Sequence, residues 1–213
     1  MVRVALRFRT SVADSLTEML PSLENFMTWG QDVFIARPDY RGMILDIYTS
    51  VMPDEHLGAA DRCVASKLIE ALMLNYRGHI DDLLPAIIQT AIVGLNAPEQ
   101  VRSARVANLQ VLINAVLYNA PASIELLARA GVARKFFDEW FGLVQAAEGL
   151  PTVHMRKLSI LALSELLKLP AANVPDELKE GWTSIVAGVL HILKNLPEAL
   201  ASGLCYFFSS IMC

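Results

Sequence analysis

Cysteine and charge are both scarce in this sequence of 213 residues. The three cysteines, Cys63, Cys205 and Cys213, are odd in number, and no two of them form a CxxC pair. They predict reduced thiols rather than a disulfide framework or a zinc knuckle. Charged residues make up 19 % of the chain and hydrophobic residues 54 %. This apolar excess excludes a disordered chain and predicts a sizeable core.

The sequence also lacks the short motifs that carry common enzyme chemistry. It contains no GxSxG, HExxH, P-loop or GxGxxG pattern. No motif in the sequence therefore supports a catalytic nucleophile, a zinc site or a phosphate-binding site. The four histidines are scattered, and none stands four residues from another metal-binding residue type. We therefore expect a protein that is not an enzyme and that holds neither cofactor nor metal.

Neither a membrane span nor a nucleic-acid site is indicated by the distribution of charge. Residues 199–213 are uncharged, but they fall short of the roughly 20 residues that cross a bilayer. The net charge is −4 and the basic residues form no run, which disfavours nucleic acid as a partner.

The N-terminal residues have two interpretations. Three arginines precede the first acid, Asp14, as in a short transit peptide, but residues 2 to 8 alternate between strongly apolar and less apolar side chains like a strand. The default compartment is the cytoplasm or the nucleus.

What the sequence does contain is a succession of helical patterns in pairs. Residues 60–77 carry an apolar stripe with helical spacing, and Gly78 supplies the stop. A second helix then opens at Asp81 and Asp82, where acids suit the positive end of the helix dipole. A later second helix is interrupted near Gly131. The first helices of successive pairs begin near residues 57, 99 and 151. This spacing of roughly 40 to 50 residues is within or a little beyond the range of HEAT and armadillo units.

Several of these helices are apolar on more than one face, as residues 158–167 illustrate. A helix stacked between neighbouring hairpins buries its flanks as well as its inner face. The sequence therefore predicts an all-α fold, an α-solenoid of about four HEAT-like antiparallel helix pairs over residues 15–197. Residues 1–14 are predicted to be an atypical N-terminal segment that does not follow this repeat pattern. Residues 198–213 are predicted to be a divergent apolar tail that also departs from it. We expect these side chains to be buried between layers: Val64, Leu68, Leu72, Leu109, Ile113, Leu161 and Ile185.

The last helix is expected to span residues 174–197, with proline signals at both of its ends. For the tail after it, two arrangements stay open. It either extends this helix as an exposed apolar end or packs loosely against it, as an uncapped solenoid terminus would.

Acid pairs recur at or near the second helices, at residues 81–82, 138–139 and 176–177. Neighbouring acids on a helix point about 100° apart, so surface acids that complement helix dipoles are favoured over acid–base catalysis. An aromatic cluster surrounds Trp140. Its rings have two interpretations, packing between repeats or gripping a ligand peptide.

The order of several landmarks identifies a family. The segments "ASKLIEALMLNYRGHIDDLLPAIIQTAIVGL", "NLQVLINAVLYNAP" and "FFDEWFGLVQAAEGLPTVHMRKLSILALSELLKLP" resemble the C-terminal HEAT repeats of the importin-beta superfamily, in the branch of importin seven and importin eight. The resemblance covers residues 16 to 197. Its landmarks are the Tyr-Arg-Gly turn, the Leu-Tyr-Asn-Ala-Pro junction, and Trp140 followed by His-Met-Arg-Lys.

The resemblance implies a segment of a nuclear transport receptor, which binds its partners and catalyses no reaction. Such receptors move between cytoplasm and nucleus with basic cargo, including ribosomal proteins and histones. The full-length receptor engages nucleoporins and Ran-GTP. Acids on a concave inner surface would attract a basic cargo. The candidate cargo-binding residues are Asp81, Asp82, Asp138, Glu139, Trp140, Asp176, Glu177 and Glu180. The alternative is a HEAT or armadillo scaffold unrelated to transport.

Overall fold

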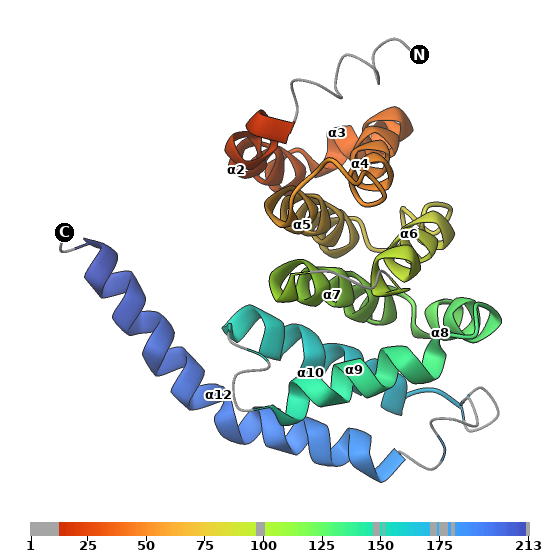
Figure 1. The fold of residues 1–213 in the computed structure, drawn as a ribbon, viewed down its shortest axis with the longest axis vertical. Helices are drawn as coiled ribbons and strands as arrows, with labels where there is room; N and C mark the ends of the chain where they lie inside the picture. Colours follow the sequence, from red (N-terminus) through yellow and green to blue (C-terminus); the bar gives the residue numbers. More distant parts are fainter. Residues whose placement is uncertain are drawn as a thin grey trace. The chain divides into compact units, whose positions relative to one another are not determined.

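A computed structural model describes residues 13–96, 101–146, 152–170 and 182–211, together with residues 150, 174 and 179. Every regular element in these residues is an α-helix (Figure 1), so the predicted all-α class with HEAT-like helix pairs is confirmed. The strand expected at residues 2 to 8 lies outside the described residues. The chain divides into two units, Met1–Leu112 and Ile113–Cys213.

The first unit is built around helix α5. It contains α2 (Ala13–Trp29), α3 (Gln31–Ala36), α4 (Pro38–Val51), α5 (Ala59–Asn75), α6 (Leu84–Asn96) and the first part of α7 (Arg102–Tyr118). Helix α5 packs against both α2 and α4, and α6 packs against α4 (Figure 1). Neighbours on two sides explain why α5 is apolar on more than one face.

The ends of α5 follow from its local sequence. At the start, the carboxylate of Asp61 accepts a hydrogen bond from the backbone N–H of Gly58 at 2.9 Å, which satisfies a donor that the helix itself leaves unpaired. Past the end, Gly78 has a φ of 79°, a left-handed conformation that glycine adopts without steric cost. The predicted stop at Gly78 is therefore confirmed, and the chain turns there toward α6.

The second unit contains the rest of α7 followed by four further described helices. These are α8 (Ala120–Arg129), α9 (Ala133–Gln145), α10 (Val153–Leu167) and α12 (Trp182–Ile211). Helix α12 packs against α10 and α9, and α8 packs against α9 and α10 (Figure 1). Between α8 and α9 the chain turns at Gly131, which has a φ of 68°. The interruption predicted near this glycine is confirmed.

Six of the seven side chains expected in the core are buried, namely Val64, Leu68, Leu72, Leu109, Ile113 and Ile185. The expectation for Leu161 is wrong, because its side chain is 52 % exposed. Helical spacing places Leu161 in line with Lys157 and Lys168, both of which are exposed. Neighbouring helices cover the other side of α10, where Leu158 and Ala162 are buried.

The last helix differs from its expected bounds. Helix α12 begins at Trp182 and continues to Ile211, so Pro197 lies inside the helix and does not end it. Of the two arrangements open for the tail, its backbone adopts the first and extends the helix. Close to the proline, the Nη1 of Arg156 on α10 donates a hydrogen bond to the carbonyl of Asn195 at 2.7 Å. This bond fixes α12 to α10 two residues before the proline.

Two tyrosines of the first unit, Tyr48 and Tyr76, are fully buried, and burial raises the pKa of both phenols. The folded protein therefore favours the neutral form of both phenols. The stabilisation that this gives is complete below the ordinary tyrosine pKa, and it is lost as pH rises above that value because the phenols of the unfolded chain ionise first. We expect the free energy of unfolding to fall above about pH 10, by up to about 1.4 kcal/mol per pH unit for Tyr48. Urea unfolding followed by circular dichroism at several alkaline pH values measures this slope. Tyr48→Phe should make the slope shallower, and equal slopes for the two proteins would contradict the prediction.

Candidate functional site

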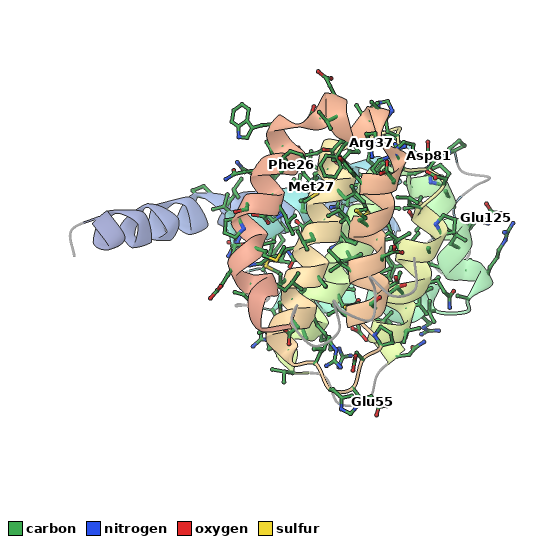
Figure 2. All side chains as sticks on the ribbon, turned by 90° about the horizontal axis from the view of Figure 1, so that it is seen from above. Phe26, Met27, Arg37, Glu55, Asp81 and Glu125 are labelled. Carbon is green, nitrogen blue, oxygen red and sulfur yellow. The ribbon has the colours of Figure 1, made fainter. Side chains whose placement is uncertain are left out.

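Asp81 and Asp82 lie in the turn that leads into α6, and both side chains are exposed. The turn is anchored by Ile80, which is buried and whose carbonyl accepts hydrogen bonds from the N–H groups of Leu83 and Leu84 at 3.0 and 3.2 Å. The acids therefore stand at the positive end of the α6 dipole, as the sequence predicts. A further acid pair, Asp54 and Glu55, lies elsewhere in the first unit. Figure 2 shows Asp81 at the opposite end of this unit from Glu55, so these two acid pairs form separate surfaces.

The second described acid pair, Asp138 and Glu139, lies on α9. Asp138 is exposed, and its Oδ2 is 3.8 Å from the Nε of Arg134, one helical turn earlier. The Arg134 and Asp138 side chains are 85 % and 73 % exposed, so the pair is screened by solvent and contributes little to stability. Glu139 is half-buried. On this helix an arginine thus offsets the charge that a basic ligand would meet.

Trp140 is 0 % exposed. Its Nε1 donates a hydrogen bond to the Oγ of Ser159 on α10 at 3.2 Å. Its ring lies 5.4 Å from that of Phe136 and 6.2 Å from that of Phe137, between centroids. Of the two interpretations of the aromatic cluster, packing accounts for this environment, because the indole has no exposed surface with which to grip a peptide.

Ser159 is the partner that sequence reasoning missed. It is 1 % exposed and lies on the inner face of α10. A signal was present, because Ser159 falls at helical spacing between Met155 and Ala162, both of which are buried. A serine inside such a stripe needs a hydrogen-bond partner when it is buried.

The structure brings the candidates together only as local pairs. Asp81 and Asp82 belong to the first unit, and Asp138 and Glu139 belong to the second. The remaining candidates, Asp176, Glu177 and Glu180, lie outside the described residues.

Two further properties concern the described part of the chain. Within it, no three side chains of His, Cys, Asp or Glu gather closely enough to hold a metal ion. None of the described helices combines the length and the apolar character that are needed to span a membrane.

Comparison with known proteins finds similarity along most of the chain. It is 28 % identical over 203 residues, 92 % of its length, to importin-8 of Danio rerio. It is 25 % identical over 197 residues to the importin beta-like SAD2 homolog of Arabidopsis thaliana, and 23 % identical over 193 residues to the probable importin-7 homolog of Dictyostelium discoideum. Each of these two matches covers 89 % of this chain.

The chain spans only 18 to 19 % of the length of these relatives. No family model and no solved structure matches it. The predicted resemblance to the importin-beta superfamily, in the branch of importin seven and importin eight, is confirmed by the three relatives.

Proposed function

We propose that this chain contributes cargo-binding HEAT repeats to a nuclear transport receptor that imports basic proteins such as ribosomal proteins and histones. In this proposal the longer receptor moves between cytoplasm and nucleus and engages Ran-GTP and nucleoporins. The observation that carries the proposal is the similarity of 89 to 92 % of the chain to three importins and importin-like proteins. The paired helices of both units support it, because stacked helix pairs present extended surfaces suited to binding.

Exposed acids supply the attraction that the proposal requires. Asp81, Asp82 and Asp138 are exposed, and the net charge of the chain is −4. Such charges attract a basic ligand over about 8 Å at physiological salt and chiefly raise its association rate. Asp176, Glu177 and Glu180 remain part of the proposed set. Trp140 supports the surface from within and does not touch the cargo.

A pair of charge variants with opposite effects tests the proposal. Changing Asp81 and Asp82 together to Asn should weaken binding of a lysine-rich histone-tail peptide by about threefold to tenfold, mainly through a slower association rate. Arg134→Gln should strengthen binding by up to about threefold, because it removes the cation that competes for Asp138. Surface plasmon resonance at two salt concentrations measures both effects, and circular dichroism verifies the fold.

The matched control is Glu125→Gln on α8. Glu125 is an exposed acid whose Oε1 lies 2.5 Å from the Nη2 of Arg129, one turn away, and it is not a cargo candidate. If this control weakens binding as much as the Asp81 and Asp82 change, the attraction comes from net charge and the proposed location is wrong. Absence of binding to any basic peptide would leave the scaffold function as the better account.

A further inference from the structure

The acidic turn, residues 76–84, links α5 to α6 and carries the first candidate acid pair. Two of its residues are held by the core of the first unit. Tyr76 is fully buried, and its hydroxyl donates a hydrogen bond to the carbonyl of Met27 on α2 at 2.7 Å. Ile80 is fully buried as well. The backbone of the turn is therefore fixed on both sides of Gly78, although the acids that follow are exposed.

A third anchor of the acidic turn comes from α4. The Nη1 of Arg41 donates a hydrogen bond to the carbonyl of His79, two residues before Asp81. The donor is a charged guanidinium, and such hydrogen bonds are stronger than those between neutral groups. The Arg41 side chain is half-buried, whereas Tyr76 and Ile80 are in the core. Arg41 can therefore be replaced without opening the core.

Arginines hold two other connections between helices in the same way. The Nη2 of Arg62 on α5 donates to the carbonyl of Asp54 at 2.9 Å, in the segment between α4 and α5. The Nε of Arg156 on α10 donates to the carbonyl of Leu150 at 2.9 Å, shortly before α10 begins. In each case a helical arginine bonds a backbone carbonyl of the neighbouring connection. The bond of Arg41 is thus one instance of a repeated arrangement in this chain.

We propose that Arg41 is a positioning residue that holds the acidic turn in the conformation in which Asp81 and Asp82 meet a basic ligand. This inference rests on the proposed function, because it gives Arg41 a role at the cargo surface. A turn that is fixed before binding loses less conformational freedom when a basic segment docks on it. Loss of the Arg41 bond should therefore shorten the lifetime of the complex. The long-range attraction that sets the association rate should persist or increase, because a cation is removed.

Hydrogen exchange of the full chain without any ligand tests the first step. The N–H groups of His79, Leu83 and Leu84 are hydrogen-bonded within the acidic turn. In Arg41→Ala they should exchange about threefold to tenfold faster than in the wild type, because the turn opens more often. Arg41→Lys keeps the charge and an N–H donor, so its exchange should stay within about twofold of the wild type. Equal exchange in Arg41→Ala and the wild type would overturn the proposal.

Arg37→Ala is the matched control. Arg37 directly precedes α4, and Figure 2 shows it at the same end of the first unit as Asp81. Its Nε and Nη2 donate to the carboxylate of Asp39 at 3.0 and 2.8 Å. Its replacement removes the same charge but keeps the bond of Arg41 to the turn. Exchange within the acidic turn should therefore match the wild type, and circular dichroism verifies the fold of every variant.

Surface plasmon resonance with a lysine-rich histone-tail peptide tests the second step. Arg41→Ala should release the peptide about threefold to tenfold faster, with an association rate that is unchanged or higher. Arg37→Ala should alter only the association rate, and Arg41→Lys should restore slow release. Unchanged release from Arg41→Ala would mean that Arg41 acts as a charge alone, which overturns the proposal. If the peptide does not bind even the wild type, the proposed function fails, and hydrogen exchange alone decides whether Arg41 holds the turn.

Discussion

Replacing Trp140 with alanine should lower the free energy of unfolding by about 3–5 kcal/mol, the cost of emptying a large buried aromatic site. The indole is 0 % exposed and contacts the rings of Phe136 and Phe137. Its loss also leaves the buried Oγ of Ser159 without the indole donor, which adds to the cost. Urea unfolding followed by circular dichroism measures the change.

Two further variants separate the effect of burying the Trp140 ring from other effects of removing an aromatic side chain. Trp140→Phe keeps an aromatic ring but removes the indole donor, and it should cost about 1–3 kcal/mol. Trp29→Ala removes a ring that is 85 % exposed, and its effect should stay within about 0.5 kcal/mol. If Trp140→Ala unfolded like the wild type but released a bound basic peptide faster, the ring would be a cargo anchor and its packing role would be minor.

The helices themselves could be predicted from the sequence, because their signals are local. The apolar period of α5, the glycine stop after it and the acids before α6 each depend on a few neighbouring residues. The predicted burial of Leu68 and Leu72 is confirmed for the same reason. Leu161 differs, because a helix that is apolar on most of its circumference does not show which side its neighbours cover. That depends on the packing of α10 with α8 and α12.

In the candidate site, too, some features could be predicted from the local sequence and others could not. The exposure of Asp81 and Asp82 follows from their position at a helix start. The ion pair of Asp138 with Arg134 was visible as a four-residue spacing of opposite charges, although sequence reasoning did not use it. The role of Trp140 could not be decided from the sequence, because an aromatic cluster on an amphipathic helix looks the same whether it packs inside or grips a ligand.

Buried polar contacts between helices were the least predictable feature. Asn108 on α7 is 1 % exposed. Its Nδ2 donates to the carbonyl of Ala91 on α6 at 2.7 Å, and its Oδ1 accepts a longer hydrogen bond from the hydroxyl of Tyr48 on α4 at 3.4 Å. One asparagine thus joins three helices of the first unit. Nothing in the sequence near residue 108 reveals these partners, because Tyr48 lies sixty residues away along the chain.

Gly94 on α6 makes room for this asparagine, and Gly94→Ala should therefore destabilise the first unit. A Cβ atom at position 94 would stand 2.8 Å from the Cγ and Nδ2 of Asn108 and 2.9 Å from its Oδ1. The amide is buried and hydrogen-bonded, so it can yield only by breaking its bonds to Ala91 and Tyr48. We expect a loss of about 2–4 kcal/mol in urea unfolding, from overpacking and from unpaired buried polar groups.

Gly42 supplies the control, because it lies within helix α4 of the same unit and a Cβ there would meet nothing within 4 Å. Gly42→Ala should stabilise the helix by about 0.5–1 kcal/mol, so the sign of the effect separates crowding from helix propensity. Combining Gly94→Ala with Asn108→Ala tests the cause directly. Once the amide is gone the extra methyl group has space, so the double variant should lose clearly less stability than the sum of the two single changes. Additive losses would show that Gly94 is required for a reason other than the close approach of Asn108.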